Sequence, residues 1–390
     1  MSNILFLTAQ YTGAASANGI CTKNVVKELT KKGHAVTVLG YENGVSEENV
    51  YTIPVYYANT KNCKISKIGK TVGSFFLPVL DKNREQNFTK MTLSLCEEKE
   101  IDAVVCIFFP LETVSVMKCV KEAFPHIKTI VYELDSIGDG IFASSKFHYL
   151  ATLAYEKWSG NNYCYADKII IMKSHKKYWN RVWGKRYGNK LLIADIPVLI
   201  ERTLPYVEKT SDSPTLFLYG GLLGKKYRSP GYLLSVVDSY SKKERVSMDF
   251  YTKGDCEQQI STFRETNPCV HQHGYVPEVV LEEAIARADI LVSIGNRVSR
   301  SVPSKLITYL SYGKPVVHFA SQREDVCIQY LEQYPLGLTL CEWDSVEENT
   351  NKLYDFVKRT RGNTVEFSKV EDTLLMNSPR YSADLIIENL

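Results

Sequence analysis

The feature that most constrains the fold is an alternation of short apolar segments with longer amphipathic ones, which runs through half of the chain and then starts again. In the first half, apolar segments of strand length lie at 3–9, 34–40, 103–108, 129–134 and 168–172. Helical patterns lie between them, and Gly33 stands where the first helix should stop. Strands that alternate with helices predict a parallel sheet covered on both faces.

The second half repeats this organisation, with apolar segments at 215–221, 246–252, 270–276, 289–295 and 315–320. We therefore predict an α/β protein with two Rossmann-like, doubly wound domains in tandem. Pro197, Pro205, Pro214 and a polar cluster break the periodicity between the two series. The predicted domains are 1–196 and 197–372, with a final helix in 373–390 that packs back on the first domain.

Composition agrees with two soluble domains. The chain has 390 residues, and domains commonly have about 150. The formal net charge of +3 is too small to indicate a nucleic-acid partner. The ten cysteines never show CxxC spacing, which argues against zinc and favours reduced thiols. Since no run approaches the roughly 18 apolar residues of a membrane span, we expect a cytoplasmic protein.

Two stretches of the second half resemble a known family. They are LFLYGGLLGKKYRSPGYLL (216–234) and HGYVPEVVLEEAIARADILVSIGNRVSRSVPSKLITYLSYGKPVV (273–317). Their order resembles that of GT-B glycosyltransferases, in particular the family 4 type of bacterial surface polysaccharide biosynthesis. The resemblance implies that the second domain binds a nucleotide-activated sugar, that the first domain binds the acceptor, and that transfer occurs in the cleft between them. It also implies retention of anomeric configuration.

A helix predicted to begin near Pro303 or Ser304 offers unpaired N–H groups and its positive end to a ligand. The diphosphate of a sugar nucleotide is a suitable ligand for that end. Lys305 can add a full charge where the leaving phosphate develops negative charge. The plainer interpretation is that Pro303 and Ser304 only start the helix and that Lys305 is solvated.

Further donor contacts are implied in the loops that follow strands. Gly220 and Gly221 leave room for a ligand, and Arg228 stands where the family has a cation for the diphosphate. Lys225 and Lys226 are competing candidates, and all three cations could be solvated. The loop with Tyr275 and Val276 lies where related enzymes hold the nucleobase. Asn296 follows the strand 289–295, at the edge where such sheets bind ligands, unless it is a turn asparagine.

The candidate acceptor residues lie in the first domain. Asn18 and Gly19 belong to the loop 13–20 after the first strand, and Glu133 and Asp135 follow another strand. A carboxylate there can orient or deprotonate an acceptor hydroxyl, and Asp135 is our candidate for that catalytic role, with capping as the alternative.

One departure from the family pattern concerns its Glu-x7-Glu motif, because Arg300 and Thr308 occupy the two glutamate positions. Sugar-nucleotide specificity therefore cannot be transferred from this motif, and the two substitutions weigh against the ribose recognition, stereochemical outcome and activity that the resemblance implies. We expect no metal, because the cleft loops contain no DxD motif and because Arg228, Lys305 and a helix terminus can neutralise the leaving group.

The segment 173–190 has seven basic and no acidic residues, interleaved with Trp179, Trp183 and Tyr187. Basic residues with interfacial aromatics suit an anionic membrane surface. The alternative is a solvated basic face whose tryptophans pack inward.

These observations predict a glycosyltransferase that moves a sugar from a nucleotide diphosphate sugar to a polysaccharide or a lipid-linked oligosaccharide, on the inner face of the cell membrane. The alternative is a catalytically silent GT-B partner that binds a glycosylated protein or another transferase, which Arg300 and Thr308 favour. A third option is a sugar-nucleotide isomerase on the same fold.

Overall fold

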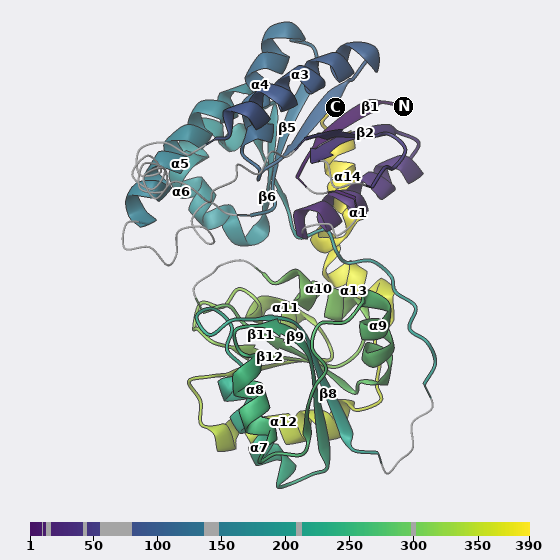
Figure 1. Ribbon diagram of the computed structural model, residues 1–390, viewed down its shortest axis with the longest axis vertical. Helices are drawn as coiled ribbons and strands as arrows, with labels where there is room; N and C mark the ends of the chain where they lie inside the picture. Colours follow the sequence, from purple (N-terminus) through teal and green to yellow (C-terminus); the bar gives the residue numbers. More distant parts are fainter. Residues whose placement is uncertain are drawn as a thin grey trace. The chain divides into compact units, whose positions relative to one another are not determined.

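The computed structural model describes residues 1–9, 11–12, 17–41, 45–54, 80–135, 148–207, 213–297 and 302–390. It divides into two compact units. Unit 1 contains Met1–Val198 and Met376–Leu390, and unit 2 contains Leu199–Leu375. Each unit has its own parallel sheet with helices packed on it (Figure 1), which confirms the predicted fold class.

Unit 1 is built on a seven-stranded parallel sheet in the order β3-β2-β1-β4-β5-β6-β7. The strands are β1 (Asn3–Leu7), β2 (Ala35–Tyr41), β3 (Val50–Ile53), β4 (Ala103–Ile107), β5 (Lys128–Glu133), β6 (Lys168–Met172) and β7 (Leu191–Ala194). The central strands β1, β4 and β5 are buried along almost their whole length. This burial explains their continuous apolar sequences, since helices cover both faces of a parallel sheet.

The helices of unit 1 come from both ends of the chain. In the described parts of the unit they are α1 (Ala17–Lys31), α3 (Lys82–Glu98), α4 (Glu112–Ala123), α5 (His148–Asn162), α6 (Lys176–Tyr187) and α14 (Pro379–Ile387). The first and last of these, α1 and α14, lie side by side (Figure 1). Lys32 forms an ion pair with Asp384 at 2.7 Å, and the Tyr132 hydroxyl on β5 hydrogen-bonds the Ser382 hydroxyl at 2.8 Å. The C-terminal segment thus completes the core of unit 1.

Unit 2 contains a six-stranded parallel sheet in the order β10-β9-β8-β11-β12-β13. The strands are β8 (Thr215–Leu223), β9 (Val246–Gly254), β10 (Val270–Gln272), β11 (Ile290–Ile294), β12 (Val316–Ala320) and β13 (Gly337–Cys341). The strands β11 and β12 are fully buried. A core of aromatic and branched side chains, including Phe217, Phe250 and Phe356, lies against this sheet.

The helices of unit 2 are α7 (Gly231–Ser241), α8 (Glu257–Arg264), α9 (Glu278–Arg287), α10 (Ser304–Ser311), α11 (Ile328–Gln333), α12 (Val346–Thr360) and α13 (Phe367–Thr373). Local sequence fixes several of their ends. Ser345 caps α12 by accepting a hydrogen bond from the Glu348 N–H. Gly313 follows α10 with φ +68°, and a Cβ there would lie 2.2 Å from the Val365 carbonyl oxygen. Only glycine fits this position.

Three strands were not predicted from the sequence: β3, β7 and β13. All three are the outermost strands of their sheets, and most of their residues are half-buried. Among the helices of the described residues, none is both long and apolar enough to cross a membrane.

Candidate functional site

The candidate site in unit 2 lies where the strand order of its sheet reverses. Open α/β sheets bind ligands outside the carboxyl ends of their strands at such a point. In unit 2 the reversal falls between β8 and β11. The predicted donor residues Gly220 and Gly221 lie near the carboxyl end of β8, and Asn296 lies just beyond the carboxyl end of β11.

Arg228 is folded back toward β8 by a tight turn. Gly224 and Arg228 exchange two backbone hydrogen bonds of 3.0 and 2.7 Å, which close this turn. The Arg228 guanidinium donates to the Asn296 side-chain oxygen at 2.6 Å, so the structure brings these two predicted residues together. Arg228 Nε is buried without a partner, and no carboxylate among the described residues pairs with this guanidinium. The cation is therefore oriented but not neutralised.

Helix α10 carries the predicted phosphate contacts at its first turn. Pro303 is the N-cap residue and Ser304 is the first helical residue, and no side chain caps this end. Lys305 is half-buried and forms no ion pair with the residues that the structure covers. Burial lowers the pKa of its ammonium group, and Arg202 acts in the same direction while Glu278 opposes it. A half-buried ammonium that has no paired anion among the described residues favours an anionic ligand.

Tyr309, which sequence reasoning missed, fastens α10 to the end of β8. Its hydroxyl accepts a hydrogen bond from the Gly220 N–H at 2.7 Å and donates to the Gly220 carbonyl at 3.2 Å. A Cβ on Gly220 would lie 3.0 Å from Leu281, so protein atoms fill the space beside this glycine and its contact with a donor stays a prediction. Lys305 precedes Tyr309 by four residues, so both share one face of α10. That face meets β8.

The loop after β10 exposes a tyrosine. Tyr275 is 75% exposed, with the Lys253 ammonium 4.2 Å from the centre of its ring. Val276 beside it is half-buried. An exposed aromatic face next to a cation suits a planar base, but no hydrogen bond links this loop to Arg228 or Lys305 among the described residues, so its base-binding role stays a prediction.

Thr308, which stands where the family has the second glutamate of its Glu-x7-Glu motif, has a structural role in α10. The Thr308 hydroxyl donates to the Ser304 carbonyl within α10 at 3.1 Å. Arg300, at the first glutamate position, lies outside the described residues. No carboxylate at 308 is therefore available for a ribose.

The candidate acceptor residues lie at the carboxyl ends of strands β1 and β5 in unit 1. The Asn18 amide, in the first turn of α1, donates to the Asp135 carboxylate at 3.0 Å, while Gly19 is buried in that turn. Desolvation raises the pKa of Asp135, and the hydrogen bond from Asn18 opposes this. Glu133 is 4% exposed, its Oε1 atom has no partner, and burial raises its pKa to about 8. Glu133 is therefore mostly neutral at pH 7, whereas Asp135 has a polar partner.

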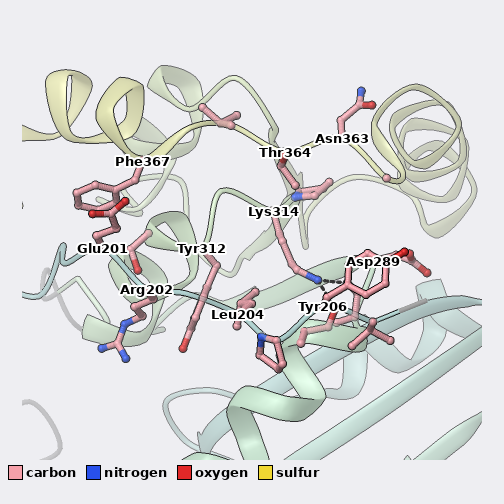
Figure 2. Close-up of a pocket in the computed structure, with 18 residues that line it drawn as sticks. Glu201, Arg202, Leu204, Tyr206, Asp289, Tyr312, Lys314, Asn363, Thr364 and Phe367 are labelled. Atoms are coloured by element: carbon pink, nitrogen blue, oxygen red, sulfur yellow. Dashed lines mark hydrogen bonds between the residues drawn. The ribbon is translucent and has the colours of Figure 1, made fainter. Parts of the chain in front are cut away.

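A separate pocket of about 560 Å³ lies at the amino ends of β11 and β12 (Figure 2). Its lining includes Arg202, Tyr206, Asp289, Tyr312 and Lys314. The charged groups there already have partners, since Lys314 donates to the Ala286 and Ala288 carbonyls and Arg202 pairs with Glu282 at 3.1 Å. This pocket lies at the amino ends of the strands, whereas Arg228 lies at their carboxyl ends. The cations of the pocket have protein partners, so they are less available to an anionic ligand than Arg228 is.

The segment 173–190 forms α6 with the short turns that flank it, and its two kinds of residue point in opposite directions. Trp179, Trp183 and Tyr187 are at most 5% exposed and belong to the core of unit 1. The Trp183 ring N–H donates to the Glu156 carbonyl at 3.2 Å. The prediction that these aromatic residues contact a membrane is therefore wrong, because residues four apart share a helix face and here that face packs inward. The basic residues are mostly exposed.

No protein-family model matches the sequence, and no curated protein sequence is similar to it. Solved structures match along the whole chain. A glycosyltransferase from Rickettsia africae has 13% identity and a TM-score of 0.63, with 99% of this chain and 97% of that chain covered. The HepE protein of Anabaena, solved in complex with UDP-glucose, has 11% identity and a TM-score of 0.62, and the lipopolysaccharide outer core galactosyltransferase WaaB has 14% and 0.61, each with full coverage of both chains.

At such low identities the likeness concerns the fold. The seven-stranded and six-stranded parallel sheets correspond to the two Rossmann-like domains of these structures. This chain therefore has the GT-B fold.

Proposed function

We propose that this protein is a glycosyltransferase that takes a sugar from a nucleotide diphosphate sugar. One observation carries the proposal. Arg228 and Lys305 are cations without carboxylate partners in the described chain, and both lie at the carboxyl edge of the sheet in unit 2, which is the ligand-binding edge of this type of sheet. The HepE relative of the same fold was solved with UDP-glucose, which supports a donor of this class.

The two cations have distinct chemical roles in the proposed reaction. Breaking the bond between the sugar and the diphosphate places negative charge on the leaving phosphate oxygen. Arg228 can bind two phosphate oxygens through its planar guanidinium. Lys305 and the uncapped first turn of α10 add positive charge at the same edge, and charge stabilisation of the leaving group lowers the barrier.

We further propose that transfer needs no divalent metal, because these groups neutralise the leaving group themselves. Activity that persists in excess EDTA supports this statement. Activity that is lost in EDTA and restored by added Mg²⁺ or Mn²⁺ contradicts it.

The proposed acceptor is a polysaccharide or a lipid-linked oligosaccharide, bound at the edge of unit 1 that carries Asn18, Gly19, Glu133 and Asp135. Asp135 is the better candidate for contact with the acceptor hydroxyl, since Asn18 holds its carboxylate at the sheet edge. Glu133 is only 4% exposed, so it is proposed as part of this edge and not as a direct contact with the acceptor hydroxyl. A retaining outcome remains part of the proposal.

The outer face of α6 and its flanking turns is the proposed contact with an anionic membrane. Lys173, Lys176, Lys177, Arg181, Lys185 and Arg186 are exposed there. Because the aromatic residues are buried, this contact would be electrostatic and should weaken at high salt. Flotation with vesicles of anionic and of zwitterionic lipid tests it, and equal recovery from both contradicts it.

The function is tested in two steps. Thermal shift with UDP, GDP, CMP and ADP first identifies the nucleotide that stabilises the folded chain. Radiolabelled sugars of that nucleotide are then supplied with polysaccharide and lipid-linked acceptors. Transfer of label supports the proposal. Nucleotide binding without transfer favours the catalytically silent partner, and absence of binding contradicts both donor recognition and the proposed reaction.

A further inference from the structure

A buried polar cluster lies directly beneath the candidate donor site. His318 on β12 is fully buried, and its Nδ1 lies 3.1 Å from the Ser293 hydroxyl on β11. Its Nε2 lies 3.1 Å from one carboxylate oxygen of Asp325, in the loop after β12. The other oxygen of Asp325 accepts from the Cys327 N–H at 2.9 Å. Burial alone would raise the pKa of Asp325, but the hydrogen bonds from His318 and Cys327 hold it below its ordinary value.

The residue types of this cluster also occur in hydrolytic sites and in metal sites. The Ser293 hydroxyl is not accessible to a substrate, because Ser293, His318 and Asp325 are 5%, 0% and 6% exposed. The ligand atoms of His318, Asp325 and Cys327 lie within 4.8 Å of one another, close enough to share an ion. However, both ring nitrogens and both carboxylate oxygens have protein partners. The contacts are those of a satisfied structural network.

The network touches the donor site through Gly295. A Cβ on Gly295 would lie 2.0 Å from the Asp325 carboxylate and 3.2 Å from His318 Nε2, so the backbone after β11 rests on this pair. The loop that carries Asp325 also holds the same backbone through two hydrogen bonds. Ser321 donates to the Gly295 carbonyl at 3.2 Å, and Gln322 donates to the Asn296 carbonyl at 2.8 Å.

Asn296 in turn orients Arg228 through the 2.6 Å hydrogen bond of its side-chain oxygen. A continuous series of contacts therefore runs from His318 through Asp325 and its loop to Asn296, and from Asn296 to the Arg228 guanidinium. Each contact in the series fixes the direction of the next group. None of these buried groups needs to touch the donor.

We propose that His318 and Asp325 are positioning residues for donor binding, because they hold loop 321–327 and Gly295 in the arrangement that aims Arg228 at the diphosphate. The inference rests on the proposed function of that site. Loss of His318 leaves one oxygen of the buried Asp325 carboxylate without its partner, and the loop must move to solvate that oxygen. Gln322 then loses its contact with the Asn296 carbonyl, and Arg228 loses its fixed direction.

The test compares four variants with the unmodified protein. His318→Leu removes the partner of Asp325, and His318→Gln keeps a donor near the position of Nε2. Gln322→Ala removes the loop contact from a half-buried position. Tyr334→Phe is the matched control, because the Tyr334 hydroxyl donates to the Lys314 carbonyl at the amino end of the same strand β12. Titration calorimetry measures the Kd of UDP, GDP and ADP at a temperature where every variant used is folded.

We expect His318→Leu to raise the Kd of the bound nucleotide about 10- to 100-fold, a range typical of a displaced positioning group. His318→Gln should recover most of this loss, Gln322→Ala should raise the Kd less than His318→Leu, and Tyr334→Phe should leave it unchanged. If His318→Leu does not fold, the comparison of Gln322→Ala with Tyr334→Phe decides. Equal Kd values for these two, or an unchanged Kd in folded His318→Leu, overturn the inference. If the unmodified protein binds none of the three nucleotides, the proposed function fails instead.

Discussion

The two ends of the sheet in unit 2 both carry cationic side chains, but they differ in what those side chains contact. At the amino end, Lys314 donates to two carbonyl groups and Arg361 pairs with Asp289 at 3.5 Å. At the carboxyl end, Arg228 donates to uncharged oxygen atoms of Leu222 and Asn296, and neither Arg228 nor Lys305 has an ion pair within the described chain.

This difference separates cations that stabilise the fold from cations that are available to a ligand. A partly buried charge without an ion pair costs stability, so its presence at the carboxyl ends of the strands supports the proposed donor site. The 560 Å³ pocket beside Lys314 and the amino ends of β11 and β12 shows the converse, because a large volume there coincides with satisfied charges (Figure 2).

The largest effect is expected at the glycine that lies on the buried network. Gly295→Ala places a Cβ 2.0 Å from the Asp325 carboxylate, so we expect the free energy of unfolding to fall by roughly 3 kcal/mol. Gly362→Ala at the amino end meets no atom within 4 Å and costs only the strain of φ +83°, about 1 kcal/mol. Urea denaturation measures both, and equal losses would contradict the tight packing of the carboxyl end.

The next effect concerns the two arginines. Arg228→Gln should weaken binding of the nucleotide diphosphate about 100-fold and change the stability by less than about 0.5 kcal/mol. Arg361→Gln should lower the stability by roughly 1 kcal/mol, since it loses an ion pair and its hydrogen bond to the Ser213 carbonyl, and should leave the Kd unchanged. Calorimetry and urea denaturation of both variants check this. If both variants lose stability and neither binds the nucleotide more weakly, the two ends of the sheet do not differ in function.

A third prediction extends the comparison to unit 1, whose sheet edge carries a carboxyl group without a full set of partners. Because folding raises the pKa of Glu133 from 4.5 to about 8, the folded state binds more protons than the unfolded state between these pH values. Stability contributed by protonated Glu133 is thus lost as the pH rises through this range. Glu133→Gln should raise the free energy of unfolding by roughly 2 kcal/mol at pH 8 and by almost nothing near pH 4.

Glu112→Gln is the control for this prediction, because the Glu112 carboxylate is also buried but accepts a hydrogen bond from the Asp81 N–H. It should give no gain at pH 8. Thermal melts of both variants across pH 4 to 8 make the measurement, and a Glu133→Gln gain that does not depend on pH argues against a protonated Glu133.

The smallest effect is expected for two lysines, Lys305 in the first turn of α10 and Lys314 in the turn between α10 and β12. Lys305→Met should weaken nucleotide binding about 10-fold without loss of stability, since no ion pair within the described residues is removed. Lys314→Met should leave binding unchanged and lower the stability by about 1 kcal/mol, because two carbonyl groups lose their donor. An equal drop in nucleotide affinity for both variants would contradict the difference between the carboxyl and amino ends of the sheet.

Much of this architecture was predictable from the order of strands and helices. The central strands are buried on both faces and therefore have continuous apolar sequences, such as 103–107 in β4. The edge strands β3 and β7 were missed because each has only four residues and is mostly half-buried. Each pairs with the strand that precedes it in the chain, β2 and β6 respectively, and this pairing leaves no continuous apolar segment in so short and half-buried a strand.

The candidate site was predictable only in part. The position of Arg228 after β8 and the start of α10 at Ser304 agree with the sequence. The spacing of Trp179 and Trp183 indicates a shared helix face but not which face packs inward. His318 was missed because it stands in an apolar strand, and its role becomes visible only through contacts with Asp325 and Ser293. Such contacts depend on tertiary packing, which a single sequence does not show.

The return of the chain to unit 1 through α14 has a consequence for biosynthesis. The Tyr132 hydroxyl meets Ser382, and Lys32 meets Asp384, only after all of unit 2 has been translated. Unit 1 therefore cannot complete its core before unit 2 has been synthesised, although most of its sequence comes first. The usual order, in which N-terminal domains fold first during synthesis, does not hold for this last step.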